Sequence, residues 1–204
     1  MTTRRALLLA PLAATLLAAL SACSKGDELD DMRGLVLGES DLGRDFALQG
    51  TDGKGHRLAD FRGKAVMVFF GFTQCPDVCP TALQRAVEVK QALGPAGDRL
   101  QVLFVTVDPE RDTPEVLRAY TGAFDPAFLG LYGSDQEIRD TARAFKVFYQ
   151  KVPTGDSYTM DHSSFNYLYD PNGRLRVIMK HTQSVADYVN DIQKLLAVPP
   201  AQAA

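Results

Sequence analysis

The alternation of apolar and polar residues along the chain predicts a mixed α/β domain over residues 44–198. Two continuous apolar runs, AVMVFF at 65–70 and LQVLFVTV at 100–107, are typical of strands buried at the centre of a sheet. The segment between them, TALQRAVEVKQALG, has the apolar spacing of a helix and ends on a glycine. Strand, helix and strand in this order predict a crossover unit whose two strands run parallel.

Patterns on either side of this unit add further elements. Phe46 and Leu48 alternate with polar neighbours, and after the turn TDGKG the segment HRLADF predicts the return strand of a hairpin. Helices are expected after Asp112 or Thr113 as cap, after the capping box SDQE at 134–137, and from Ser184 to about Ala197, and strands at about 163–169 and 174–180. This order predicts a thioredoxin-like fold with an N-terminal β-hairpin and an additional helical insertion.

The first 22 residues have the pattern of an export signal. MTTRR supplies a positive end, and a 15-residue apolar run follows it, shorter than the ~20 residues that span a bilayer. LSAC at 20–23 resembles a bacterial lipobox, in which the peptidase cuts before a lipidated cysteine. We therefore expect Cys23 to carry lipid, with plain secretion or an uncleaved anchor as the alternatives.

The lipobox predicts a domain on the extracytoplasmic, periplasmic side of a bacterial cell envelope, with inner or outer membrane left open. Residues 23–43 are interpreted as the lipidated cysteine and a flexible tether, although LVL at 35–37 has the character of a segment that docks on the domain. Residues 199–204 are expected to be a disordered tail. The formal net charge of −3, with no stripe of Lys and Arg, excludes a nucleic-acid surface.

Cys75 and Cys79, in GFTQCPDVCPTAL, stand where the first central strand passes into its helix. Ligands bind at this edge of open α/β sheets, and a helix N-terminus favours thiolate over thiol. With Cys79 at the helix start and Cys75 one turn earlier, both side chains can face one point. A structural disulfide across so short a loop stabilises little, so a redox pair or a metal site is favoured.

Two thiolates leave a coordination shell incomplete, so a third donor is needed. His162, in TMDHSSFNYLYD, follows Cys79 by 83 residues and lies on a segment that a thioredoxin-like plan brings toward the same edge. His56 belongs to the predicted hairpin and His181 to a strand end, which favours ordinary solvated roles for both. Met160 offers a thioether, although filling apolar space is its more common role.

Two carboxylates are candidates for the surroundings of the site. Asp77, between the cysteines, either tunes thiolate basicity or holds the loop, and Asp108 either orients the site or builds a turn with the proline after it. Two thiolates and one imidazole suit Cu(I), and also hold Cu(II) or Zn²⁺. Structural zinc takes four closed ligands, so three donors are better suited to holding copper and passing it on.

Three segments in order, GFTQCPDVCP, VTVDPERDTPE and DHSSFNYLYD, resemble the Sco/SenC family of thioredoxin-like, membrane-tethered copper proteins over about residues 44–197. The resemblance implies that Cys75, Cys79 and His162 bind Cu(I) or Cu(II). It implies delivery to the binuclear copper centre of cytochrome c oxidase subunit II, with another periplasmic copper chaperone as a further partner. Members commonly carry a transmembrane anchor, where this chain has a lipobox.

Other functions use the same cysteines. The pair can act as a thiol–disulfide oxidoreductase that reduces the cysteines of subunit II, or as a redox or copper sensor, and CxxxC in place of CxxC argues partly against the reductase. Thioredoxin-like peroxidases have a threonine three residues before the reactive cysteine. Phe72 and Pro76 hold those places here, which argues against a peroxidase.

Overall fold

The computed structural model describes residues 29, 31–38 and 40–199 of the chain. Within them, eight strands form one mixed sheet and two further strands pair only with each other. The sheet has the order β1 (Leu35–Val36), β10 (Leu175–Lys180), β9 (Phe165–Tyr169), β4 (Ala65–Gly71), β5 (Leu100–Thr106), β6 (Leu129–Tyr132), β2 (Ala47–Gly50) and β3 (Gly55–Arg57). The helices are α2 (Val78–Ala92), α3 (Pro114–Phe124), α4 (Asp135–Ala144) and α5 (Val185–Ala197), with 3-10 turns η2 (Leu58–Phe61) and η3 (Gly94–Arg99).

The centre of the sheet is the predicted crossover unit. Strand β5 pairs parallel with β4 over their full length and parallel with β6 on its other side, and α2 and α3 make the two connections. All seven residues of β4 are buried, which explains why this strand reads as a continuous apolar run. The crossover, the hairpin of β2 and β3, and the antiparallel pair β9–β10 confirm the expected thioredoxin-like plan.

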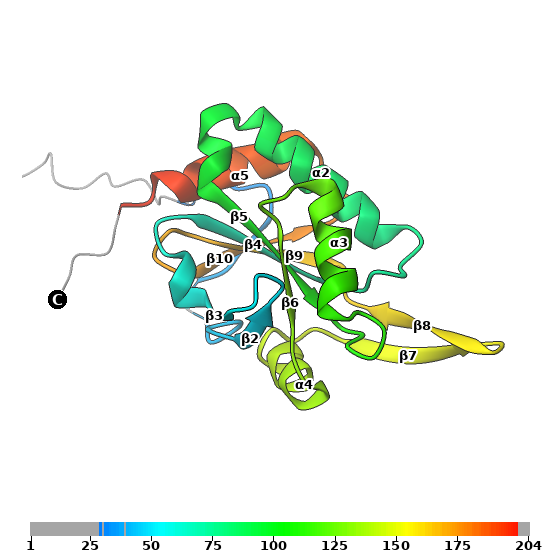
Figure 1. Cartoon of the computed structure of the whole chain (residues 1–204). Helices are drawn as coiled ribbons and strands as arrows, with labels where there is room; N and C mark the ends of the chain where they lie inside the picture. The colour runs from blue at the N-terminus through cyan, green and yellow to red at the C-terminus, as the bar shows by residue number, and fades with distance from the viewer. Residues whose placement is uncertain (1–28, 30, 39, 200–204) are drawn as a thin grey trace, which may run out of the picture. The chain divides into compact units, whose positions relative to one another are not determined.

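Neighbouring side chains of β4 point to opposite faces of the sheet, as the strand period requires. Phe69 contacts Phe104 of β5 on one face, whereas Phe70 packs against Phe145 and Tyr167 on the other. Figure 1 shows α2 and α5 side by side on one face and α4 on the opposite side. Burying each of these aromatic rings contributes roughly 1.5–3 kcal/mol to stability. Because these rings stand on β4 and β5 or pack against them, the core is centred on these two strands.

Helix starts follow the capping signals in the sequence. Thr113 caps α3 by accepting a hydrogen bond from the Val116 N–H, so the choice between Asp112 and Thr113 falls on Thr113. Ser134 and Ser184 form capping boxes at the starts of α4 and α5, with the acidic residues three positions on.

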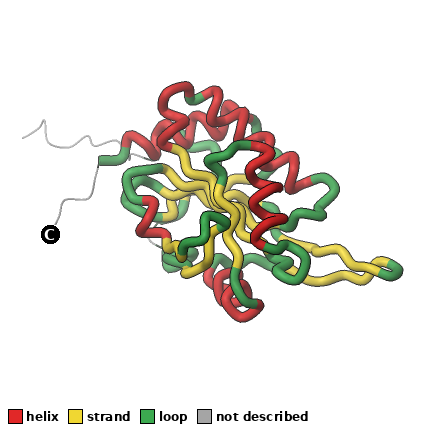
Figure 2. The backbone as a smooth tube through the Cα atoms, in the orientation of Figure 1, coloured by secondary structure: helices red, strands yellow, loops and turns green. Residues whose placement is uncertain are grey.

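The insertion before β9 contains more than a helix. After α4, strands β7 (Tyr149–Thr154) and β8 (Ser157–His162) form an antiparallel hairpin that pairs with no strand of the main sheet. Figure 2 shows this hairpin as an arm that extends beyond the helices. Most of its residues are exposed or half-buried, so it lacks the apolar signal that identified the other strands.

Part of the segment expected as a tether lies against the domain. Strand β1 pairs with β10, and the backbone N–H groups of Arg33 and Gly34 donate to the buried carboxylate of Asp191 at 2.8 and 2.9 Å. A side chain at Gly34 would meet Val177 at 2.3 Å, so glycine permits this close approach. The LVL segment therefore docks on the sheet edge.

The signal peptide, the lipobox cysteine and the tail from residue 200 lie outside the described residues. Among the helices that are described, none combines the length and the apolar character that crossing a membrane requires.

Candidate metal centre

The two cysteines lie where the central strand β4 passes into α2. Cys79 is in the first turn of α2 and fully buried, and Cys75 precedes it in the loop and is half-buried. The backbone N–H of Cys79 donates to the Cys75 sulfur at 3.4 Å. A Cβ on Gly71, the last residue of β4, would lie 2.8 Å from the Cys79 sulfur, so glycine makes room for this thiol. Both cysteines are free thiols.

The hairpin brings the histidine to these thiols. His162 is the last residue of β8, and its Nε2 atom lies 3.5 Å from Sγ of Cys79. Its Nδ1 atom lies 3.0 Å from the carbonyl oxygen of Ser163. A carbonyl only accepts, so Nδ1 carries a proton and donates to Ser163, which leaves Nε2 as the ring atom that can ligate a metal beside the sulfurs. Phe69 and Phe72 hold the ring edge-on, with centroids at 6.1 and 5.8 Å.

The ligand atoms of Cys75, Cys79 and His162 all lie within 4.8 Å of one another. Cys79 and His162 are 83 residues apart in the sequence, and the fold brings their side chains into contact. Two sulfurs and one imidazole nitrogen form a soft donor set that suits Cu(I) and also accepts Cu(II). One sulfur is buried and the other partly open, so a bound ion would be reachable from one side.

The two thiols differ in protonation. A hydrogen bond from the Cys79 thiol, which outweighs partial burial, lowers the pKa of Cys75 to about 3. The same hydrogen bond, together with burial and the Cys75 charge, raises the pKa of Cys79 far above its usual range. At neutral pH the pair therefore holds one proton, with Cys75 as thiolate and Cys79 as thiol.

The two carboxylates expected near the site do not belong to the group of converging donors. Asp77 is the exposed N-cap residue of α2 and makes no side-chain cap bond, and its backbone N–H faces the Cys75 sulfur. Asp108 is buried and accepts from Arg111 Nε at 2.5 Å and from the Tyr158 hydroxyl at 2.8 Å. Asp108 thus attaches the hairpin to the loop after β5.

Sequence reasoning missed Asp112, which it considered only as a helix cap. This buried carboxylate accepts from the backbone N–H and hydroxyl of Thr73 and from the hydroxyl of Thr106, the two hydroxyls at 2.6 Å. Burial raises its pKa, against these hydrogen bonds. Asp112 therefore anchors the cysteine loop to β5. Its position in the motif VDPERDTP, after a strand at the ligand-binding edge, was the available signal.

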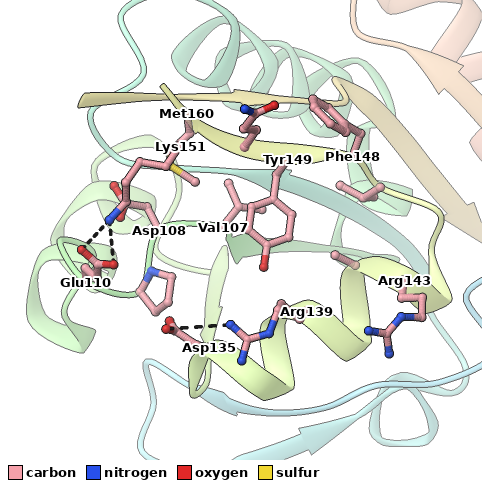
Figure 3. Close-up of a pocket in the computed structure, with 14 residues that line it drawn as sticks. Val107, Asp108, Glu110, Asp135, Arg139, Arg143, Phe148, Tyr149, Lys151 and Met160 are labelled. Carbon is pink, nitrogen blue, oxygen red and sulfur yellow. Dashed lines mark hydrogen bonds and ion pairs between the residues drawn. The ribbon is translucent and has the colours of Figure 1, made fainter. Parts of the chain in front are cut away.

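The remaining donors considered from the sequence are engaged elsewhere. His56 contacts the carboxylate of Asp52 at 3.0 Å in the β2–β3 hairpin, and His181 contacts the carbonyl oxygen of Ser164 at 3.3 Å. Met160 is buried on the face of β8 that packs inward. Figure 3 shows it among the residues lining a pocket of about 570 Å³ between β7, α4 and the loop after β5.

Comparison with known proteins agrees with this geometry. The SCO1/SenC family model matches residues 36–197. The chain belongs to the SCO1/SenC family. An SCO2-like protein of Rickettsia felis is 41% identical over 136 residues, which cover 65% of this chain and 66% of the relative, just under two thirds of its length.

Solved SCO structures share the fold. Copper-bound ScoI of Bradyrhizobium japonicum has a TM-score of 0.70 at 38% identity and covers 76% of this chain and 99% of its own. Apo Sco1 of Thermus thermophilus has a TM-score of 0.72 at 42% identity, covering 80% and 96%. Copper is thus bound by family members, and the Cys75–Cys79–His162 group has the donors to bind it here.

Two more distant structures share the fold. A SCO1/SenC family lipoprotein of Bacillus anthracis has a TM-score of 0.65 at 25% identity, covering 74% of this chain and 92% of its own. BsSco, described as a member of the Sco family of cytochrome c oxidase assembly proteins, shares the fold at a TM-score of 0.62 and 24% identity, covering 83% and 98%.

Proposed function

We propose that this protein is a copper metallochaperone that assists assembly of the binuclear copper centre in cytochrome c oxidase subunit II. The observation that carries the proposal is the convergence of Cys75, Cys79 and His162 within 4.8 Å. A metallochaperone must bind its ion and also release it to a partner. Three donors, two of them on partly exposed residues, leave room for a partner's ligand to reach the metal.

Capture begins at the thiolate of Cys75, because this sulfur is ionised and reachable. Binding of Cu(I) by both sulfurs then displaces the proton of Cys79 to solvent, and Nε2 of His162 completes the set. In transfer, a thiolate of the partner joins the copper and replaces the ligands of this site one at a time. Cys79 regains a proton as the ion leaves, and no electron moves.

The experiment is to mix the copper-loaded protein with the apo soluble domain of oxidase subunit II, under anaerobic conditions, and to follow metal and thiol redox state together. The proposal predicts that copper moves to the partner while Cys75 and Cys79 end as free thiols. If the partner's cysteines are shown to be reduced and this protein still retains all of the copper, the proposal is contradicted.

A second candidate function is thiol–disulfide exchange with the cysteines of subunit II. It is favoured by the low pKa of Cys75, which makes it a nucleophile, and by Cys79 standing next to it as a resolving thiol. Attack by the Cys75 thiolate on a disulfide of the partner forms a mixed disulfide and frees one partner thiolate. Cys79 loses its proton and attacks the Cys75 sulfur, which releases the second partner thiolate, so the partner disulfide is reduced by two electrons while a Cys75–Cys79 disulfide forms. This reaction needs no histidine, so unchanged exchange rates in His162→Ala would favour it. A sensor would be favoured instead if copper or the redox state of the cysteines controlled binding to a partner to which no copper is transferred.

For localisation, we propose that residues 1–22 are a signal peptide, that Cys23 is lipidated and that the domain stands on the extracytoplasmic side of the envelope. LSAC supports this, and so does the lipoprotein relative of Bacillus anthracis. The tether is then shorter than the sequence suggested, because residues 35–37 lie on the sheet edge.

A further inference from the structure

The hairpin that carries His162 has no strand pairing with the main sheet, so other contacts must fix its direction. Two-stranded hairpins are marginal by themselves, and their orientation depends on side-chain packing. In β8, Tyr158, Met160 and His162 alternate with outward-facing residues and therefore share one face of the strand. Whatever fixes Tyr158 also fixes the face on which the imidazole stands.

Arg111 makes this contact. Its guanidinium stacks on the Tyr158 ring with 3.7 Å to the centroid, and Nη1 donates to the Tyr158 carbonyl oxygen at 2.9 Å. Nε donates to Asp108, and the same carboxylate accepts from the Tyr158 hydroxyl. The Arg111 side chain is 17% exposed and that of Asp108 1%, so these charge-assisted bonds are shielded from solvent.

Arg111 also reaches the cysteine loop. Nη1 donates to the side-chain oxygen of Gln74, the residue before Cys75, at 3.1 Å. The guanidinium carbon lies 6.0 Å from the ring of Phe72, and that ring meets the imidazole of His162 edge-on. One side chain thus bridges the segment that holds the thiols and the hairpin that holds the imidazole.

A second ion pair lies nearer the base of the hairpin, because Lys151 pairs with Met160 whereas Tyr158 pairs with Pro153 closer to the turn. Lys151 of β7 contacts both carboxylate oxygens of Glu110 at 2.7 Å, as Figure 3 shows. Both partners are about half exposed, at 43% and 58%, so solvent screens this pair. The buried contact of Arg111 is therefore the stronger of the two links between the hairpin and the loop after β5.

We infer that Arg111 is the positioning residue that presents His162 to the two thiols, so that the affinity of the site for copper depends on Arg111 through His162. The inference rests on the proposed function, since it concerns the same three ligands. Arg111 need not touch the metal. Its guanidinium sets the distance between two ligand-bearing segments that no backbone pairing holds together.

A double-mutant cycle tests this. Cu(I) affinity is measured anaerobically, by competition with a chromophoric chelator, for the parent, Arg111→Gln, His162→Ala and the double variant. Loss of a residue that orients a metal-binding histidine weakens binding about 10-fold or more, so this loss is expected for Arg111→Gln in the parent. In the His162→Ala background the same change is expected to alter affinity less than about 2-fold, because no imidazole is left to position.

Controls separate positioning from general damage. Arg118→Gln removes another arginine that bonds a distant carbonyl, that of Thr51, and is expected to leave copper affinity unchanged. Arg111→Lys keeps the charge beside Asp108 but loses the planar guanidinium, so its copper affinity should fall between those of the parent and Arg111→Gln. It replaces Arg111→Gln in the cycle if that variant does not fold. Cu(II) spectra add a second readout, with the thiolate charge-transfer band of Arg111→Gln shifting toward that of His162→Ala.

Equal losses in both backgrounds would overturn the inference, because Arg111 would then act on the thiols or on the fold as a whole. No loss in the parent would overturn it as well. If His162→Ala alone binds copper like the parent, the three-ligand site fails, and the inference fails with it. The cycle thereby distinguishes an error in the proposed ligands from an error in the role of Arg111.

Discussion

At the scale of single residues, the site depends on three atoms in different states. Cys75 is a thiolate that solvent reaches, Cys79 is a buried thiol, and His162 presents Nε2 because its Nδ1–H donates to the Ser163 carbonyl oxygen. Without copper, the two cysteines together therefore carry one negative charge rather than two. This difference controls how copper binding responds to pH.

The first prediction concerns protons. Because the pKa of Cys75 is about 3 and that of Cys79 is raised, binding of one Cu(I) at pH 7 should release about one proton, that of Cys79. As pH falls from about 9 to about 7, each unit should weaken apparent affinity ~10-fold, because the proton of Cys79 competes with the metal. Proton release in weakly buffered solution and competition titrations measure both. Release of two protons would show that Cys75 is also protonated in the apo protein.

The second prediction concerns Gly71. A Cβ at this position would lie 2.8 Å from the Cys79 sulfur and 2.9 Å from the ring of Phe104, so alanine must displace one of them. Gly71→Ala should destabilise the apo protein by about 1–3 kcal/mol in urea unfolding, and weaken copper binding because Cys79 moves. Gly122→Ala is the matched control, since a Cβ there meets nothing within 4 Å. Equal stability of both variants would contradict the tight packing at Gly71.

At the scale of elements, the sequence predicted the segments whose burial gives a clear pattern. The run 65–70 and the helix after it were predictable because β4 is buried on both faces and α2 on one. The hairpin β7–β8 was not, because its residues alternate between half-buried and exposed on a two-stranded arm. His162 was therefore placed near the thiols without the element that brings it there.

The carboxylate of Asp112 shows the same limit. Asp112 and Arg111 each contact the cysteine loop, at residues 39 and 37 positions away, and no local pattern reveals such partners. Periodicity reports which face of an element is buried, whereas these bonds depend on how loops meet at the sheet edge. Chemistry and spacing singled out the two cysteines and left His162 as one candidate third donor, and the family resemblance implied all three as ligands. The residues that hold them could not be predicted.

The third prediction tests the anchor of the cysteine loop. One carboxylate oxygen of Asp112 accepts from the Thr73 hydroxyl and the other from the Thr106 hydroxyl. In Asp112→Asn only one oxygen remains to accept, so one buried donor loses its partner. We expect a loss of about 1–3 kcal/mol in free energy of unfolding and weaker copper binding. Urea unfolding and Cu(I) competition measure the two effects. Asp156→Asn, in the exposed turn of the hairpin, is the control and should change neither.

At the scale of the whole molecule, a folded copper-binding domain follows a segment with the pattern of a lipoprotein signal. The fourth prediction is that Cys23→Ser abolishes lipid attachment and moves the protein from the membrane fraction to the soluble fraction of the envelope. Labelling with a radioactive fatty acid and fractionation measure this. The purified variant should bind copper as the parent does, and continued membrane binding without lipid would point to an uncleaved anchor.

The central claim is that His162 completes a copper site with Cys75 and Cys79, and anaerobic Cu(I) titration of the reduced protein tests it most directly. The parent, His162→Ala and the control His181→Ala are compared by chelator competition. We predict one copper per chain for the parent and for His181→Ala, and at least about 10-fold weaker binding for His162→Ala, because one ligand is lost. Equal stoichiometry and affinity for His162→Ala and the parent would contradict the account.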